Sequence, residues 1–236
     1  MKVRIFVLIF LIAAAATSAL GDSRQILFRE EFRNLSGWEP LTFPKISKHS
    51  TYTIVTENNH TILKAESHGS ASAIVYRKTF NVGEYPRMRW RWKVDNVYKK
   101  GDIRDKSGDD YPIRVYVLFP YDPKQAGVAE RLEYGIAKAI YGQYPPHSTL
   151  NYVWTGQNIA ERIITSPYTD RAKIIILENG GSAIGTWVEE TVNIFDDYRA
   201  AFGKEPPPTA GIAIMNDSDN TGEAAVSYVE YIEVFR

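Results

Sequence analysis

A strict alternation of apolar and basic side chains runs through Met88-Arg89-Trp90-Arg91-Trp92-Lys93-Val94. Successive side chains of a β-strand point to opposite faces of a sheet, so this pattern predicts a strand with one apolar and one basic face. Trp90 and Trp92 are expected to pack in a core. The segment therefore predicts a fold built around β-sheets.

Similar strand signals recur on both sides of this segment, separated by Gly, Pro, Asn and Asp. Helical spacing occurs at 125–141, and acids followed by Gly203 predict a short helix at 196–203. This combination predicts an all-β fold: an antiparallel two-sheet β-sandwich of jelly-roll (concanavalin-like) type with one or two short surface helices. The predicted strands cover residues 26–32, 51–57, 60–66, 71–80, 86–95, 112–119, 150–155, 172–178, 185–194, 210–216 and 225–235.

The beginning of the chain has the pattern of a secretory signal peptide. Lys2 and Arg4 precede an apolar run from Phe6 to Ala16, and small residues then offer cleavage sites. A membrane anchor is the alternative, although the run is short for a span of roughly 20 residues. We expect a signal peptide at 1–21, a single β-sandwich domain at 22–236, and a periplasmic or secreted protein with no stable membrane span after cleavage.

Charge and cysteine content exclude several classes of protein. The 236 residues carry 28 basic and 28 acidic side chains, whereas a nucleic-acid binder needs a concentrated basic surface, so no nucleic-acid partner is expected. The absence of cysteine excludes disulfides, cysteine nucleophiles and iron–sulfur clusters. The four histidines lack metal-ligand spacing, so zinc is not expected. Fifteen tyrosines and five tryptophans suit both a core and stacking on sugar rings.

Two short acidic loops border strongly apolar strands. Gly108-Asp109-Asp110-Tyr111 leads into the strand at 112–119, and the strand at 210–216 leads out into Asp217-Ser218-Asp219-Asn220-Thr221-Gly222. If the two strands are antiparallel neighbours, both loops lie at the same edge of one sheet, where Arg114 can pair with their acids. Such a group can bind a cation, accept hydrogen bonds from sugar hydroxyls or act in acid–base chemistry.

Calcium is the one cofactor that these residues suggest. Asp217, Asp219 and Thr221 alternate through a glycine-containing turn, and calcium prefers several carboxylate and carbonyl oxygens in close succession. A helix–loop–helix calcium site does not fit, because its twelfth position would be Tyr228 instead of Glu. The alternative is a turn whose Asp and Asn side chains cap their own backbone.

A second polar group is expected on the strand predicted at residues 185–194. Trp187, Glu189 and Asn193 share a face of that strand and offer a ring for stacking and two polar groups for sugar hydroxyls. Glu189 with Asp109 or Asp217 would also supply the two carboxyl groups of a glycosidase, which lie about 5–5.5 Å or 6.5–9.5 Å apart.

The basic face of the alternating strand has two interpretations. Arg89, Arg91 and Lys93 either contact acidic sugars or a carboxylate such as Glu189, or form a solvated outer face. Glu190 points away from Glu189 and is expected to be an edge or paired acid.

Several motifs occur in a characteristic order along the chain. They are Gly108-Asp109-Asp110-Tyr111 before Arg114-Val115-Tyr116-Val117, Asn151-Tyr152-Val153-Trp154, Trp187-Val188-Glu189-Glu190-Thr191-Val192-Asn193, Asp197-Tyr198-Arg199-Ala200-Ala201-Phe202-Gly203 and Gly211 to Thr221. Together, over residues 26–235, they resemble the secreted bacterial family catalogued as domain of unknown function 3047. The resemblance implies a β-sandwich similar to lectin and glucanase jelly rolls and carries over no catalytic residue. Asn216 and Ser218 stand where the family is expected to have Thr, a departure that keeps both acids of the loop.

We therefore predict an exported protein of unknown function that binds a carbohydrate or cell-envelope glycan, or another small polar ligand, on one polar and aromatic sheet face. The alternatives are a glycoside hydrolase or lyase that uses Glu189 with Asp109 or Asp217, and a structural envelope protein that binds another protein. The prediction requires Asp109, Arg114, Glu189 and Asp217 to converge in the fold. The expected ligand-binding residues are Arg89, Arg91, Asp109, Arg114, Trp187, Glu189, Asn193, Asp217 and Asp219.

Overall fold

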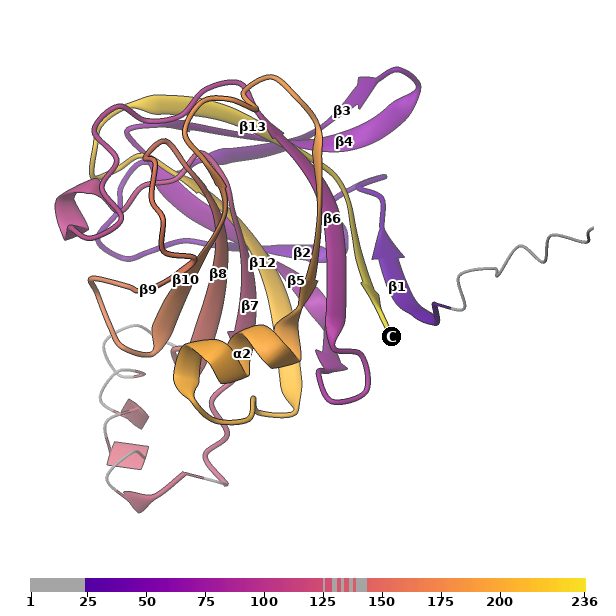
Figure 1. Cartoon of the computed structure of the whole chain (residues 1–236), viewed down its shortest axis with the longest axis vertical. Coiled ribbons are helices and arrows are strands. Elements are labelled where there is room, and N and C mark those ends of the chain that lie inside the picture. The colour runs from indigo at the N-terminus through magenta and orange to yellow at the C-terminus, as the bar shows by residue number, and fades with distance from the viewer. Residues whose placement is uncertain (1–23, 125, 129–130, 133, 136–137, 139–143) are drawn as a thin grey trace, which may run out of the picture.

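The computed structural model describes residues 24–236 apart from 125, 129–130, 133, 136–137 and 139–143, and its strands form two β-sheets that pack against each other (Figure 1). The signal peptide expected at 1–21 lies outside the described residues. Within the described part of the chain, no helix is long and apolar enough to span a membrane.

Sheet A is antiparallel and has β13 at its centre. Its strand order is β11-β6-β13-β4-β3, and β1 pairs with the last residues of β13. These strands are β1 (Ile26–Glu30), β3 (Thr51–Glu57), β4 (His60–His68), β6 (Arg87–Val94), β11 (Val188–Asn193) and β13 (Ala224–Phe235).

Sheet B has the strand order β2-β5-β12-β7-β8-β10-β9 and is antiparallel except for the parallel pair β8 and β10. The predicted two-sheet β-sandwich of jelly-roll type is therefore confirmed. Two short edge strands were not predicted, because four and three residues are too few to display an alternation. The strands are β2 (Trp38–Leu41), β5 (Ala71–Asn81), β7 (Arg114–Phe119), β8 (Ser148–Thr155), β9 (Ile163–Thr165), β10 (Ala172–Asn179) and β12 (Thr209–Asp217).

Helices play a minor part in the described chain. The helix predicted at 196–203 is confirmed as α2 (Ile194–Phe202), which ends at Gly203 in the left-handed conformation with φ 69°. A 3₁₀ turn, η1 (Lys106–Gly108), lies in the loop before β7. The helix predicted at 125–141 lies largely outside the described residues.

Aromatic side chains from both sheets fill the space between them. Trp90 and Trp92 of β6 are fully buried, as predicted, and their ring centroids lie 5.3 Å apart. Trp90 contacts Tyr152 of β8 at 5.4 Å between centroids, and Trp92 contacts Trp154 of the same strand at 5.8 Å. These contacts join sheet A to sheet B.

The register of β7 and β12 places the two acidic loops together. The strands are antiparallel neighbours, with Met215 opposite Arg114, so the predicted arrangement at one edge of the sheet is confirmed. Val115 and Val117 belong to the core between the sheets. The alternate residues, Arg114 and Tyr116, therefore face the outer side of sheet B.

Candidate functional site

A buried ion cluster forms where β7 begins and β12 ends. The guanidinium of Arg114 binds both carboxylate oxygens of Asp217, with Nε 3.0 Å from Oδ1 and Nη2 in contact with Oδ2. Nη1 lies 3.4 Å from Oδ2 of Asp109, and Nη2 donates to the backbone oxygen of Asp109 at 2.7 Å. The ring of Tyr111 lies 4.4 Å from the guanidinium carbon. Arg114 thus joins residues that are about one hundred positions apart in the chain.

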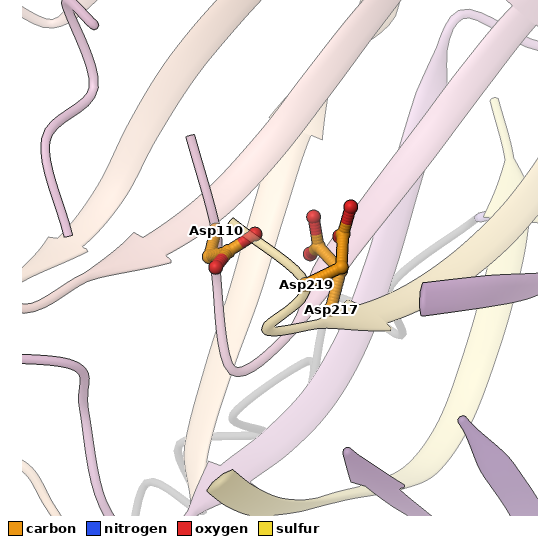
Figure 2. A group of neighbouring side chains, drawn as sticks. All are labelled: Asp110, Asp217 and Asp219. Atoms are coloured by element: carbon orange, nitrogen blue, oxygen red, sulfur yellow. The ribbon is translucent and has the colours of Figure 1, made fainter. Parts of the chain in front are cut away.

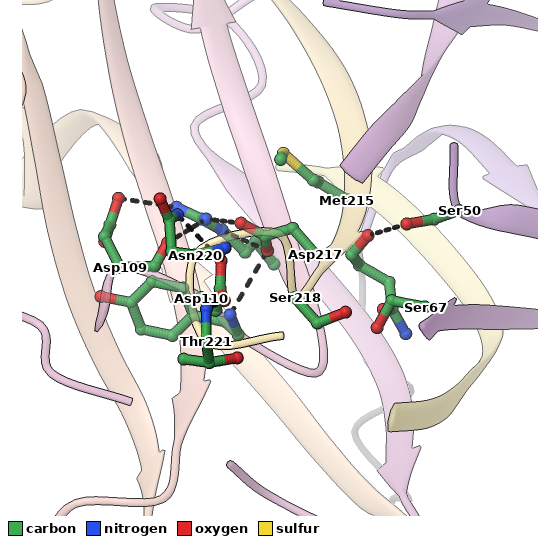
Figure 3. A network of polar contacts seen from close by, with 12 residues as sticks. Ser50, Ser67, Asp109, Asp110, Met215, Asp217, Ser218, Asn220 and Thr221 are labelled. Atoms are coloured by element: carbon green, nitrogen blue, oxygen red, sulfur yellow. Dashed lines mark hydrogen bonds and ion pairs between the residues drawn. The ribbon is translucent and has the colours of Figure 1, made fainter. Parts of the chain in front are cut away.

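Asp110 holds the second acidic loop in place. Its Oδ2 accepts from the backbone N–H of Thr221 at 2.6 Å, and its Oδ1 accepts from the side-chain amide of Asn220 at 3.0 Å (Figure 3). The hydroxyl of Tyr168 lies 3.3 Å from Oδ1 of Asn220. The loop after β12 is therefore held by side chains from two other segments.

Three carboxyl groups gather at this edge. Oxygens of Asp110, Asp217 and Asp219 lie within 4.8 Å of one another (Figure 2). The calcium set expected from the sequence was Asp217, Asp219 and Thr221, and the structure brings a further acid, Asp110, next to the two aspartates of this set. The Thr221 hydroxyl accepts from the backbone N–H of Glu223. Asp110 and Asp217 already accept hydrogen bonds from protein donors, so calcium binding here stays an untested prediction.

The charges of the cluster do not cancel. Four carboxyl groups, those of Asp109, Asp110, Asp217 and Asp219, surround the single guanidinium of Arg114. Burial raises the pKa of Asp217, and contact with Arg114 lowers it. Since arginine keeps its proton and would otherwise be buried unpaired, we expect this pair to stay ionised at neutral pH. Burial, and after it the charge of Asp110, raises the pKa of Asp219.

A pocket of about 380 Å³ opens beside the cluster. The carboxylate of Asp219 accepts from its own backbone N–H, and Oδ1 of Asp109 is buried without a partner of acceptable geometry, although the Tyr111 hydroxyl lies near that carboxylate. The pocket thus combines open acceptors with apolar and aromatic walls. Its lining comprises Phe43, Pro44, Lys45, Ile46, Ala71, Asp109, Arg114, Tyr116, Tyr168, Met215, Asp217, Asp219 and Asn220.

Glu189 does not join this cluster, and the expected convergence of the four residues is therefore wrong. Glu189 lies opposite Arg91 in the pairing of β11 with β6, on the outer face of sheet A. Arg114 faces the outer side of sheet B, so the two groups point away from opposite sides of the sandwich. The glycosidase pairs of Glu189 with Asp109 or Asp217 are excluded by this placement.

The expected basic stripe is neutralised within sheet A. Arg89 lies 2.8 Å from a carboxylate oxygen of Glu233, and Arg91 lies 2.7 Å from Glu230. Glu189 accepts a hydrogen bond from Tyr231. Trp187 covers this face, with Arg91 at 5.4 Å and Lys93 at 4.9 Å from its ring centroid. The stripe is an internally paired face, because Arg89 and Arg91 lie next to acids of β13 and Lys93 lies 3.4 Å from a carboxylate oxygen of Glu57 at the end of β3.

Asn193 has a local structural role. It is the N-cap of α2, and its side-chain oxygen accepts from the backbone N–H of Asp196 at 3.3 Å. Its position at the end of β11 separates it from the pocket of sheet B. The predicted single site is thus divided: Asp109, Arg114, Asp217 and Asp219 lie together, and Arg89, Arg91, Trp187, Glu189 and Asn193 do not join them.

Glu190 is an acid of the edge strand β11 and lies next to another acid, Glu178 of β10, with its Oε1 buried and without a hydrogen-bond partner among the described residues. Burial, and then the charge of Glu178 on β10, raises the pKa of Glu190 from 4.5 to about 7. The folded protein therefore holds this proton more tightly than the unfolded chain does. Between about pH 4.5 and pH 7 the folded state binds more protons, so this group's contribution to stability falls as the pH rises through that window.

Glu190→Gln is expected to raise the free energy of unfolding at pH 8 by roughly 1–2 kcal/mol, after allowance for solvent screening, because it removes the penalty of a poorly solvated charge. At pH 5 the variant and the wild type should differ little, since the carboxyl is then mostly protonated in the folded state. Urea unfolding at both pH values measures the difference. An equal effect at the two pH values would show that ionisation of Glu190 is not its cause.

Several pocket residues were not predicted from the sequence. Phe43 and Ile46 lie in the connection between β2 and β3, and Tyr168 lies between β9 and β10. Phe43, Ile46 and Tyr168 do not belong to any motif that can be recognised in the sequence. Tyr116 and Asn220 carried a usable signal, because each lies within two residues of Arg114 or Asp219.

Comparison with known proteins identifies a family without a function. Residues 36–233 match the family model described as "Protein of unknown function (DUF3047)". None of the curated proteins compared with this chain matches it.

Solved structures resemble the chain in fold alone. A seed lectin of Lotus tetragonolobus has 10% identity and a TM-score of 0.42, covering 89% of this chain and 96% of the lectin. A family 11 carbohydrate-binding module of a Clostridium thermocellum cellulase has 8% identity and a TM-score of 0.41, covering 89% and 93%. Trichoderma harzianum endoglucanase 3 has 9% identity and a TM-score of 0.39, covering 85% and 99%. Similarity this weak says nothing about what the chain binds.

Proposed function

This chain belongs to the DUF3047 family of unknown function, and from that premise we propose that it binds a carbohydrate in the pocket beside Arg114. The pattern of residues 1–21 supports the further proposal that the protein is exported to the periplasm or beyond. The ligand of such an exported protein is then a glycan outside the cytoplasm, such as a glycan of the cell envelope.

The buried Oδ1 of Asp109 is the observation that carries the proposal. A carboxylate oxygen that is removed from water needs a hydrogen-bond donor. The Tyr111 hydroxyl lies near the Asp109 carboxylate, but neither Oδ1 of Asp109 nor this hydroxyl has a partner of acceptable geometry among the described residues. Sugar hydroxyls are such donors. Asp109 is only 4% exposed but lines the pocket, so a ligand that enters can reach it.

The rest of the pocket suits the same ligand. The carboxylate of Asp219 and the amide of Asn220 offer further polar contacts at the rim. Phe43, Tyr116 and Tyr168 supply rings, and the C–H face of a sugar packs on such rings while its hydroxyls bond to polar groups. The excess of carboxylates favours a neutral sugar, or one that carries a cation, over an acidic sugar.

Asp219→Asn tests the proposal without breaking the ion cluster. The full-length mature protein is screened on a glycan array, and the affinity of the strongest glycan is measured by calorimetry. Because a hydrogen bond to a charged group contributes about 1.5–3 kcal/mol, the variant is expected to bind roughly 10- to 150-fold more weakly. Glu205→Gln, at an exposed acid outside the pocket, removes one negative charge as the control.

Two further measurements distinguish simple glycan binding from calcium-dependent binding and from glycan cleavage. Affinity measured with EDTA and then with excess calcium chloride shows whether the three carboxyl groups bind calcium that the glycan requires. Release of reducing sugar from the bound glycan would reveal cleavage. The proposal fails if no glycan binds, or if Asp219→Asn and Glu205→Gln bind the glycan as tightly as the wild type.

A further inference from the structure

A second and larger groove is lined in part by the end of the segment from Phe43 to Thr51. Its volume is about 760 Å³, and its polar lining includes Lys48, His49, Glu66 and His68. Phe43 to Ile46 line the first pocket, and Lys48 and His49 line this one. The segment thus contributes to two cavities of different chemistry, with its first residues in one and its last residues in the other.

The unpaired charge in this groove is positive. The Lys48 ammonium and the His68 imidazole have no hydrogen-bond or ion-pair partner among the described side chains. His49 donates from Nε2 to the backbone oxygen of Ile46 at 3.1 Å, which leaves Nδ1 for a ligand. Glu66 is the one acid in the lining, and Lys64 lies 2.8 Å from its carboxylate. The acid is therefore neutralised from outside the groove.

Strand pairing and buried hydroxyls hold the lining in place. His68 and Glu66 face the same side of β4, opposite Ala224 and Val226 of β13. The backbone N–H of Ala71 donates to the backbone oxygen of Lys48 at 3.0 Å. Beneath it, the hydroxyls of Ser50 and Ser70 lie 3.2 Å apart, and Figure 3 shows Ser50 and Ser67 on the side of Asp217 away from Asp109. The backbone around the groove is therefore fixed before a ligand binds.

We propose that this groove binds the carboxylate or phosphate group of an anionic ligand, with Lys48, His49 and His68 as donors. Cationic donors make short, strong hydrogen bonds to such groups. The groove is much larger than the anionic group, so it also has room for the body of a small ligand. The proposal does not depend on glycan binding in the first pocket, which has the opposite charge.

The test uses three probes on the full mature protein: glucuronate, glucose and inorganic phosphate. Calorimetry and histidine ring NMR shifts report binding, and glucose, the neutral counterpart of glucuronate, reveals any contribution from the first pocket.

The double variant Lys48→Gln/His68→Gln should bind the anions about tenfold more weakly. Lys78→Gln is the control, because it removes an exposed lysine that lines neither cavity. Binding of phosphate but not of glucuronate would identify phosphate groups as the ligand. Binding of glucuronate but not of phosphate would identify carboxylates.

Glu66→Gln supplies a result of opposite sign. It removes a negative charge from the groove and frees Lys64, so anion binding should tighten, which a misfolded variant cannot imitate. The proposal is overturned if neither anion binds, if the double variant binds as tightly as Lys78→Gln, or if glucose shifts the His68 ring as much as glucuronate does.

Discussion

Arg114→Met will lower the free energy of unfolding by roughly 3–5 kcal/mol. The guanidinium of Arg114 is 6% exposed and is bound by Asp217 and Asp109, which are themselves buried. Removing it leaves carboxylates inside the protein without a counter-charge, and that costs more than the ion pair contributes. Urea unfolding followed by circular dichroism measures the change.

Arg77→Met is the matched control for this variant. Arg77 lies 3.0 Å from Glu39, but the two side chains are 59% and 64% exposed. Exposed pairs contribute about 0–1 kcal/mol, so this variant should remain close to the wild type. Similar losses in Arg77→Met and Arg114→Met would contradict the structural role assigned to the buried cluster.

A double variant separates the ion pair from simple loss of packing. In Arg114→Met/Asp217→Asn, one of the carboxylates without a counter-charge is also gone. The combined loss should therefore be smaller than the sum of the single losses by about 1–3 kcal/mol. Additive losses would show that the two side chains do not act as a pair.

Trp92→Ala is expected to cost about 3–5 kcal/mol. Trp92 is fully buried and contacts both Trp90 and Trp154, so it joins the two sheets. The small side chain leaves a cavity that rigid strands on both sides cannot close. The midpoint of thermal unfolding should fall by about 2–4 °C for each kcal/mol lost.

Trp187→Ala removes the same type of side chain from the outside of the sandwich. Trp187 rests on Arg91 and Lys93 and is only partly buried, so the loss should be about 1 kcal/mol. Equal losses at the two tryptophans would mean that the core does not lie where the alternation of residues 88–94 places it.

Alternation along single strands was enough to predict the sheets. The pattern at 88–94 identified the buried side of β6, because Trp90 and Trp92 could not both face water. The same logic placed Arg114 and Asp217 together, since an antiparallel pair brings the start of one strand to the end of the other. The sequence therefore predicted the ion cluster, although not the Asp110 contacts that hold its loop.

Alternation does not tell which sheet a strand joins, and this explains the error over Glu189. Its side of β11 was read correctly, but β11 pairs with β6 in sheet A, while Asp109 and Asp217 border sheet B. The residues that line both cavities could not be predicted from the sequence either. The segment from Phe43 to Ser50 has no periodicity, and its position depends on long-range packing.

The place of β13 has a consequence for how the protein folds. This strand pairs with β6 on one side and with β4 and β1 on the other, and it follows all three in the sequence. Sheet A therefore cannot be completed before residues 224–235 have left the ribosome. Until then β4 and β6 have unpaired edges, and such edges make a partly synthesised chain prone to aggregation.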